Sequence, residues 1–216
     1  MNSQKKIIIA SIVLLIGIFS GLAYLFNKNK QMQVEQAAAQ NSDVFVRSHS
    51  PILGSNEAKV TVVEFMDPEC ESCREFYPHI KHIMRKYEGK ARLVIRYVPF
   101  HQNSRFAIAI LEASKLQGKY WETLELLFKT QPEWGDHHNP KPELLWNYLP
   151  EVGLNIEQLK KDMQDPRIAT LIETDFNDAK TLQIRGTPSF FVNGKMVMDF
   201  GTSYLEEAID EALLAN

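Results

Sequence analysis

The two cysteines of this chain constrain its fold more than any other feature. They are the only cysteines among 216 residues, and they stand as Cys70-Glu71-Ser72-Cys73. Residues 59–66, just before them, have the composition of a buried strand, and the residues after them repeat apolar side chains at helical spacing. A helix that begins at Cys70 places this thiol among unpaired backbone N–H groups, where the helix dipole favours a thiolate. The sequence therefore predicts a redox-active pair.

Other uses of the two cysteines are less consistent with their position. Two cysteines are too few for a disulfide framework. A structural clip is a poor use of this pair, because closing so short a loop restricts the unfolded chain little. Metal binding and an incidental pair stay open as alternatives, but the strand before the cysteines and the helix after them favour redox chemistry.

The charge of the chain is unevenly distributed. The formal net charge is −3, yet residues 1–40 carry four lysines and one glutamate, so the rest has 20 basic and 26 acidic residues. A mildly acidic domain without a basic stripe argues against nucleic acid as a partner. A hydrophobic content of 44% with 10% aromatic residues is typical of a globular domain.

The N-terminal residues predict a membrane anchor. Ile7–Phe26 is a run of twenty residues without a charge, and as a helix it is about 30 Å long, enough to cross a bilayer. A secretory signal has a shorter apolar core of roughly 7–15 residues, and the small-residue site Ala37-Ala38-Ala39 lies well beyond this run. We therefore expect residues 1–26 to be an uncleaved single-pass anchor, with a removed signal peptide as the alternative.

The orientation of the anchor rests on chemistry more than on flanking charge. Lys5 and Lys6 precede the apolar run and Lys28 and Lys30 follow it, so the charge rule does not decide between the two orientations. A domain that makes disulfides belongs in an oxidising compartment. We expect the catalytic domain to face the periplasm or the extracellular side of the cell (inner) membrane, joined to the anchor by a tether over residues 27–42.

The chain after the tether predicts an α/β fold. Asp43–Arg47 is a short candidate for an edge strand, and Ala91–Val98 is a second strand after the cysteine-bearing helix. A strand–helix–strand unit of this length implies a right-handed crossover and a parallel pair. Residues 43–102 therefore form the first part of the fold.

Helical spacing then continues for some eighty residues before strands return. Residues 103–183 predict an all-helical insertion, and residues 184–216 predict the second part of the α/β fold. Asn193-Gly194 is a strong signal for a two-residue hairpin turn, with a second strand over Lys195–Phe200. A capping box, Ser203-x-x-Glu206, predicts the start of the closing helix.

The order of these parts resembles the DsbA-like branch of the thioredoxin superfamily. The resemblance covers roughly residue 50 to the C-terminus. Two motifs carry it, and they are Val63-Glu64-Phe-x-Asp-x-x-Cys70-x-x-Cys73 and Gly186-Thr187-Pro188-Ser-Phe-Phe-Val-Asn-Gly194. Each motif is weak alone, but the two together in this order are specific. The resemblance implies a thioredoxin fold with an inserted all-helical domain, here preceded by the predicted transmembrane helix.

The resemblance also implies a role for each residue that matches a motif. Cys70 matches the exposed nucleophilic thiol, and Cys73 matches the buried resolving thiol. Pro188 matches a cis proline beside the disulfide, and the backbone of Thr187 would pair with an extended substrate segment. Glu64 matches the acidic residue of the strand beneath the site, which would relay the proton of Cys73.

The dipeptide between the cysteines departs from the pattern of the strongest oxidants. Those proteins carry a histidine before the second cysteine, whereas this chain has Ser72, with Glu71 and Glu69 nearby. Negative charge near Cys70 should raise the pKa of its thiol and oppose the helix dipole. We therefore expect a less oxidising disulfide than in the strongest members of the family.

These observations predict a protein disulfide oxidoreductase that exchanges its disulfide with cysteines of extracytoplasmic proteins during oxidative folding. No cofactor and no bound metal are expected. The resemblance implies reoxidation by a quinone-linked membrane oxidase, either DsbB-like or VKOR-like. An isomerase or reductase is the nearest alternative, and a Cu(I) metallochaperone using the same two thiols is the alternative from another class.

The histidines give weaker signals. His79 and His82 are spaced i, i+3 on the first helix without matching acids or thiols, so we expect them on a solvated face. His137 and His138 lie in a probable surface loop. His101 follows the second strand, and the sequence does not decide whether it borders the active site.

Overall fold

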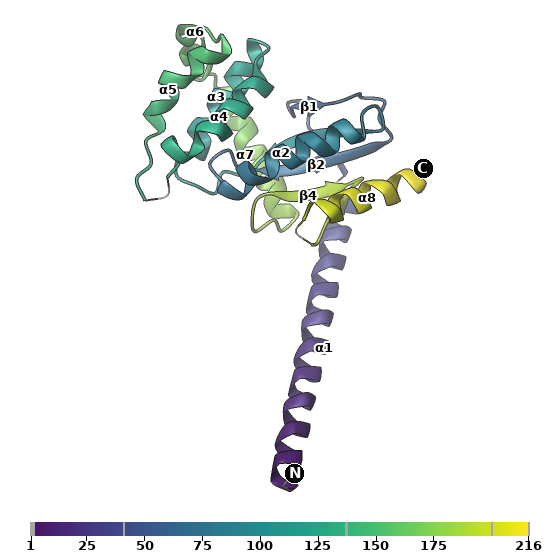
Figure 1. The fold of residues 1–216 in the computed structure, drawn as a ribbon. Helices are drawn as coiled ribbons and strands as arrows, with labels where there is room; N and C mark the ends of the chain where they lie inside the picture. Colours follow the sequence, from purple (N-terminus) through teal and green to yellow (C-terminus); the bar gives the residue numbers. More distant parts are fainter. Residues whose placement is uncertain (1–2, 41, 137, 200, 216) are drawn as a thin grey trace.

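The computed structural model describes residues 3–40, 42–136, 138–199 and 201–215. Its elements in chain order are α1 (Ser3–Gln40), η1 (Ser42–Val44), β1 (Ile52–Leu53), β2 (Val60–Met66), α2 (Glu71–Lys86), β3 (Ala91–Tyr97), α3 (Ser104–Leu116), α4 (Tyr120–Trp134), η2 (Pro142–Leu144), α5 (Leu145–Tyr148), η3 (Leu149–Val152), α6 (Ile156–Asp162), α7 (Pro166–Thr181), β4 (Ser189–Val192), β5 (Lys195–Met196) and α8 (Thr202–Leu214). Figure 1 shows α1 projecting from a rounded body that contains the other elements.

A mixed five-stranded sheet forms the centre of that body. Its strand order is β1-β3-β2-β4-β5, with β2 and β3 parallel and the other pairs antiparallel. The parallel pair confirms the crossover predicted from the strand–helix–strand spacing. Both central strands are almost entirely buried, because helices cover the sheet on its two faces.

The two faces of β2 contribute to two separate hydrophobic cores. Val62 and Met66 join the larger core, to which α2, α8 and the inserted helices also contribute. Val63 and Phe65 point the other way, into a smaller core shared with the end of α7. Side chains alternate along a strand, so Glu64 lies on the same face as Val62, beneath α2.

The helices between β3 and β4 confirm the predicted helical character of this segment. The hydroxyl of Tyr97, at the end of β3, bonds the carboxylate of Glu112 on α3 and the hydroxyl of Tyr120 on α4, each at 2.8 Å. Trp134 is fully buried, and its indole N–H donates to the carbonyl of Leu127 at 2.9 Å. The inserted helices are therefore bonded to the sheet and to one another.

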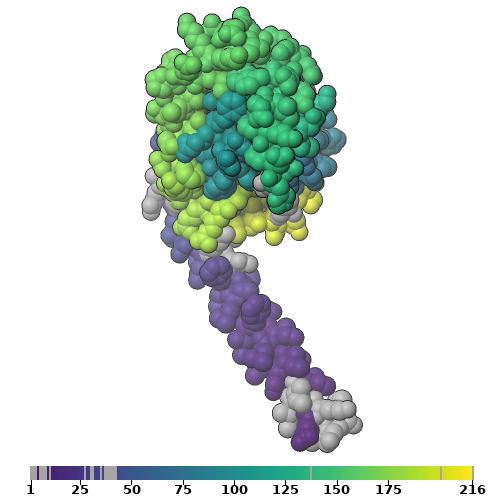
Figure 2. Space-filling view, turned by 90° about the vertical axis from the view of Figure 1, so that its left-hand side faces the viewer, coloured from purple at the N-terminus to yellow at the C-terminus, as the bar shows by residue number. Residues whose placement is uncertain are grey.

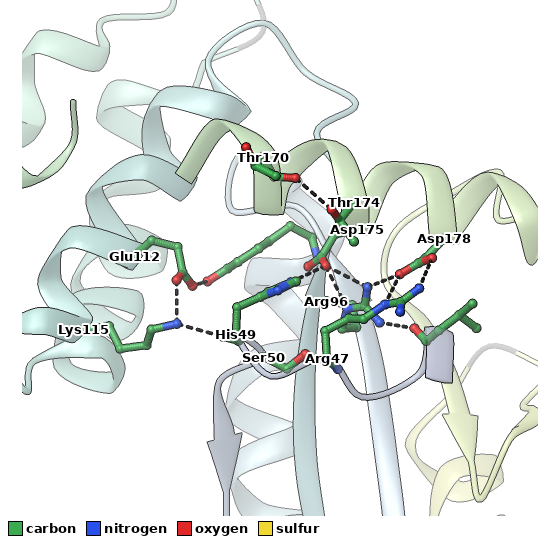
Figure 3. Close-up of polar contacts among 12 residues, drawn as sticks. Arg47, His49, Ser50, Arg96, Glu112, Lys115, Thr170, Thr174, Asp175 and Asp178 are labelled. Carbon is green, nitrogen blue, oxygen red and sulfur yellow. Dashed lines mark hydrogen bonds and ion pairs between the residues drawn. The ribbon is translucent and has the colours of Figure 1, made fainter. Parts of the chain in front are cut away.

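A cluster of ion pairs, drawn in Figure 3, is centred on Arg96 of β3, which lies beside Phe65 on the face of the sheet that bears the smaller core. The ion-pair cluster consists of Arg47, His49, Arg96, Asp175 and Asp178. Arg96 is fully buried and reaches both aspartates of α7, with bonds of 2.7 Å and 2.6 Å. Arg47 makes two bonds to Asp178, at 2.9 Å and 2.8 Å, so the cluster joins the segment before β1 to β3 and α7.

The segment predicted as an edge strand at Asp43–Arg47 does not form one. A short 3-10 helix occupies Ser42–Val44, and Val44 and Phe45 insert into the smaller core. Arg47 turns toward Asp178, and the edge of β3 is instead occupied by β1. Burial of two apolar side chains and pairing of the arginine therefore outweigh the strand propensity of this segment.

The C-terminal part of the chain forms the predicted hairpin, but the capping box is wrong. Asn193 and Gly194 have the positive φ angles of 46° and 82° that such a turn requires, although the second strand ends already at Met196. α8 begins at Thr202, one residue before the predicted cap at Ser203. Glu206 lies within the helix and accepts a bond of 2.7 Å from Lys86.

The N-terminal helix extends further than predicted. α1 continues over residues 27–40 of the segment predicted as a tether, and Val34 packs into the smaller core of the domain. Figure 2 shows α1 emerging from the body in a second view. The span predicted at Ile7–Phe26 is not supported, since no helix within the described part of the chain combines the length and hydropathy needed to cross a membrane.

Candidate active site

The two cysteines lie where β2 gives way to α2. Cys70 is the residue before the first helical position and has an extended backbone, with φ −74° and ψ 123°. Its N–H donates to the carbonyl of Asp67 at 3.0 Å, which closes the turn after the strand. Cys73 lies in the first turn of the helix, and both thiols are free. The strand, turn and helix thus place the two sulfurs together, as their spacing predicts.

Cys70 is mostly buried and holds its thiolate strongly. The residue is 8% exposed, less than the exposed thiol that we expected, whereas Cys73 is 0% exposed. The pKa of Cys70 is lowered to about 5, chiefly by a hydrogen bond from the Cys73 thiol. Burial opposes this shift, and Thr187 and the N–H groups of Cys73 and Ser72 assist it. The thiolate is therefore the form of Cys70 at neutral pH.

The expectation that nearby glutamates raise the pKa of Cys70 is wrong. The carboxylate of Glu69 is turned away and accepts bonds from the backbone and side chain of Asn103, at 2.6 Å and 2.8 Å. Glu71 is exposed to solvent, where its charge is screened. The reason for expecting a less oxidising disulfide than in the strongest members of the family is thereby removed.

Cys73 is shifted in the opposite direction. Burial raises the pKa of its thiol well above the usual value, and the hydrogen bond to Cys70 and the charges of Cys70 and Glu64 act the same way. The backbone N–H of Asp67 opposes this shift. One sulfur is thus ionised while its neighbour keeps its proton, which suits an attacking and leaving thiolate beside a protonated partner.

Glu64 lies beneath the pair as a buried acid. It is 4% exposed, on the face of β2 that α2 covers. Burial raises the pKa of Glu64 to about 8, and the negative charge of Cys70 adds to the shift. The side chain is mainly protonated at neutral pH but close to its titration point, so it can give or accept a proton.

The loop before β4 completes the site. The peptide bond between Thr187 and Pro188 is cis, as predicted. The sulfur of Cys70 lies 3.3 Å from the carbonyl of Thr187, to which the thiol can donate when it is protonated. Antiparallel pairing of β4 with β2 brings this loop to the cysteines, since Ser189 lies opposite Phe65. The structure therefore brings together all five residues named from the sequence, namely Glu64, Cys70, Cys73, Thr187 and Pro188.

Two residues of the site's framework received no role from the sequence, although one of them, Asp67, stands in the motif that ends in the cysteines. Asp67 is fully buried, and one of its carboxylate oxygens accepts from the N–H of Phe100 at 2.9 Å and from the hydroxyl of Ser104 at 2.8 Å. Gln131 on α4 donates to the carbonyls of Pro68 and Cys70, at 2.9 Å and 3.0 Å. Asp67 follows β2 as Phe100 follows β3, and the ends of parallel neighbours meet, so that contact was predictable. Gln131 had no such signal.

The histidines expected at the surface lie as follows. His79 and His82 are exposed on α2, and His138 is exposed after α4. His137 lies outside the described residues. Among the described residues, no group of three or more histidine, cysteine, aspartate or glutamate side chains is arranged to hold a metal ion.

Comparison with known proteins identifies relatives of the whole domain. The model of a family described as Thioredoxin matches residues 47–211. The chain is 33% identical to a thioredoxin-like oxidoreductase from Silicibacter pomeroyi DSS-3, with a TM-score of 0.71, covering 82% of this chain and 99% of that one. It is 29% identical to oxidised BdbD from Bacillus subtilis, with a TM-score of 0.69 over 77% and 94% of the two chains. A probable disulfide bond formation protein D from Bacillus anthracis is 27% identical over 99% of both chains.

Some curated relatives are much longer than this chain. They include Na⁺/H⁺ antiporters NhaA, such as that of Herminiimonas arsenicoxydans, which is 30% identical over 144 residues. The match covers 67% of this chain but 22% of that protein. The similarity therefore concerns a part of those proteins.

Proposed function

Since the chain belongs to the thioredoxin family, we propose that it is a DsbA-like protein disulfide oxidoreductase that acts on cysteine-containing proteins. One observation carries this proposal, namely the opposite shifts of two neighbouring thiols. The pKa of Cys70 is lowered to about 5, while the pKa of Cys73 is raised well above its usual value. The names of the Silicibacter and Bacillus relatives agree with this chemistry.

The first half of the reaction opens the disulfide. In the oxidised enzyme, a substrate thiolate attacks the sulfur of Cys70, and the bond from Cys70 to Cys73 breaks. The electron pair remains on Cys73, whose buried thiolate is unstable and takes a proton. Glu64 supports this step, because its carboxyl is largely protonated below about pH 8. The product is a mixed disulfide between the substrate and Cys70.

The second half of the reaction releases the oxidised substrate. A second substrate thiolate attacks the substrate sulfur of the mixed disulfide, and Cys70 leaves as a thiolate. A thiol with a pKa of about 5 is a good leaving group, so this step is favoured. Two electrons have then passed from the substrate to the enzyme, and both active-site thiols are reduced. Turnover requires an oxidant, for which a DsbB-like or VKOR-like membrane oxidase is the proposed partner.

The substrate is proposed to bind as an extended segment along the loop before β4. Thr187 is half-buried, and its carbonyl lies 3.3 Å from the sulfur of Cys70. A segment that adds alongside this backbone would bring its own cysteine to Cys70. Because strand addition uses main-chain groups, such a site would accept many sequences.

The proposed place of action is outside the cytoplasm, at the cell (inner) membrane. Oxidative folding needs an oxidising compartment, and the apolar side chains of α1 that the structure describes, from Ile12 to Phe26, are exposed. We propose that this segment anchors the domain. Both points are tested by labelling Cys70 with a membrane-impermeant maleimide in intact cells first treated with dithiothreitol, which opens the disulfide, and by extracting membranes with alkaline carbonate. Protection from the reagent would refute the compartment, and release by carbonate would refute the anchor.

Trapping the mixed disulfide tests the function itself. A Cys73→Ala variant should accumulate a covalent adduct between Cys70 and substrate proteins in cells, because the Cys70 thiolate attacks a substrate disulfide, releasing one substrate thiolate, and no Cys73 thiol is present to break the mixed disulfide again. A Cys70→Ala variant is the matched control and should trap nothing. Purified oxidised enzyme should also convert a reduced dithiol peptide to its disulfide. Stoichiometric Cu(I) binding without peptide oxidation would favour the metallochaperone instead, and activity only on mispaired disulfides would favour an isomerase.

A further inference from the structure

We propose that Asp67 and His101 form a pair that stabilises the thiolate of Cys70, with the imidazolium of His101 as the nearby cation. The proposal rests on the disulfide exchange proposed above. It places at the end of β3 the positive charge that the dipeptide Glu71-Ser72 between the cysteines does not supply.

The topology brings His101 to the redox pair. β2 and β3 are parallel, and Met66 lies opposite Tyr97. The N–H of Val98 donates to the carbonyl of Met66 at 2.9 Å, so the residues that follow the two strands continue side by side. The hydrogen bonds between Glu69 and Asn103 join the same two segments again, further along the chain. His101 therefore lies in the segment bonded to the turn that carries Cys70.

The hydrogen bonds of Asp67 define its charge. A single oxygen of this fully buried carboxylate lies within 3.2 Å of four partners. They are the N–H groups of Phe100 and His101, the hydroxyl of Ser104 and the imidazole Nδ1 of His101. An oxygen that receives this many donors is an acceptor only, so Asp67 is a carboxylate. The Nδ1 of His101, at 2.7 Å, is then a donor toward it.

The surroundings of His101 favour its charged form. The hydrogen bond to Asp67 is the largest influence and raises the pKa of His101, burial opposes the shift, and the charges of Asp67, Cys70 and Glu69 assist it. All three acidic groups belong to the turn after β2. Since electrostatic coupling is reciprocal, a Cys70 thiolate that favours the imidazolium is itself favoured by it. The side chain of His101 is 26% exposed, so its charge is partly open to solvent.

Titration of the Cys70 thiolate tests the proposal directly. Absorbance at 240 nm is followed against pH in the reduced protein and in His101→Gln, with His82→Gln, an exposed histidine of α2, as the matched control. The midpoint in His101→Gln should rise by roughly 0.5–1 unit, less than a fully buried opposite charge produces. The control should match the wild type. An unchanged midpoint in His101→Gln would overturn the proposal.

The reduction potential supplies a second readout that a purely structural role would not move in the same way. Equilibration with glutathione at pH 7 should show the potential of His101→Gln falling by roughly 15–30 mV, which is a threefold to tenfold change in the equilibrium constant. The difference from the wild type should narrow at higher pH, where His101 loses its proton. A His101→Lys variant, which restores a cation, should recover part of the shift. An equal loss in Lys and Gln variants with intact circular dichroism would refute the role of charge.

These outcomes separate this inference from the proposed function. If the wild type oxidises a dithiol peptide and His101→Gln has an unchanged titration and potential, then the Asp67–His101 pair is not the stabilising element. If the wild type fails to oxidise the peptide while the titration shifts as expected, the electrostatic pair stands and the function is wrong.

Discussion

A buried acid lies on each face of the two central strands, and the two acids differ in the charges that surround them. Asp175 and Glu64 are 0% and 4% exposed, yet the pKa of Asp175 is lowered and that of Glu64 is raised to about 8. Burial acts to raise both values. Asp175 also receives hydrogen bonds from His49 and Arg96 and faces the charge of Arg96, and these outweigh burial. Glu64 faces the negative charge of Cys70. The charges of the neighbours thus decide whether a buried carboxyl is fixed as an anion or ready to exchange a proton.

The largest expected effect comes from breaking the ion-pair cluster. Asp175→Ala leaves Arg96, which is fully buried, with one aspartate instead of two. We expect a loss of about 3–5 kcal/mol in the free energy of unfolding, as for other buried pairs that lose one partner. Urea denaturation measures it. Arg167→Gln removes a solvent-exposed pair with Asp165 and is the control, with no measurable change expected. Equal stability of both variants would show that the cluster does not hold the fold.

Substitution of Glu64, the buried acid on the face covered by α2, should affect the rate of disulfide exchange more than the stability of the fold. Glu64→Gln keeps the shape of the side chain but cannot donate a carboxyl proton to Cys73. We expect exchange with a dithiol peptide to slow by about 100-fold at pH 7, measured in single-turnover reactions. Because the acid form is lost as pH rises, the wild-type rate should approach that of the variant above about pH 8. Glu88→Gln, on the surface, should be unaffected. A wild-type advantage that persists unchanged at high pH would exclude proton donation.

The low pKa of Cys70 should make the stability of the reduced protein depend on pH. Its folded value of about 5 lies below the ordinary 9.0, so the stabilisation is complete above pH 9 and is lost as pH falls through about 5. Relative to Cys70→Ser, the reduced wild type should gain about 2–3 kcal/mol in the free energy of unfolding between these limits, a figure lowered to allow for screening by nearby solvent. Urea midpoints of the two proteins at several pH values measure the gain. If the difference between the urea midpoints of the two proteins stayed constant with pH, the thiolate would not be stabilised by folding.

The smallest expected effect concerns the contact between α4 and the active-site turn. Gln131→Met removes the donor to the carbonyls of Pro68 and Cys70 while nearly conserving volume. The Oε1 of Gln131 has no hydrogen-bond partner among the described residues, so the loss is confined to its N–H groups. We expect about 1–2 kcal/mol of destabilisation in thermal or urea unfolding. Gln158→Met, at an exposed position of α6, is the control. A larger loss of stability in Gln158→Met than in Gln131→Met would contradict the role given to the hydrogen bonds of Gln131.

The redox pair and the ion-pair cluster also differ in how far the sequence could predict them. The redox pair is predictable because strand, cysteines and helix are consecutive residues, and the hairpin turn follows from Asn193-Gly194 alone. The ion-pair cluster is not, because its members come from the segment before β1, from β3 and from α7, and each is an ordinary charge in the sequence. Predictions fail where a side chain's direction matters. Glu69 is adjacent to Cys70 in sequence, yet its hydrogen bonds to Asn103 turn its charge away.

The contact of Gln131 with the Cys70 carbonyl has a consequence for protein engineering. The two residues are 61 positions apart, so part of what shapes the CESC turn is encoded in a distant helix. Transplanting the tetrapeptide into another scaffold would lose the hydrogen bonds that Gln131 donates to the active-site turn. A graft that aims to reproduce the chemistry of this centre must bring α4 with it.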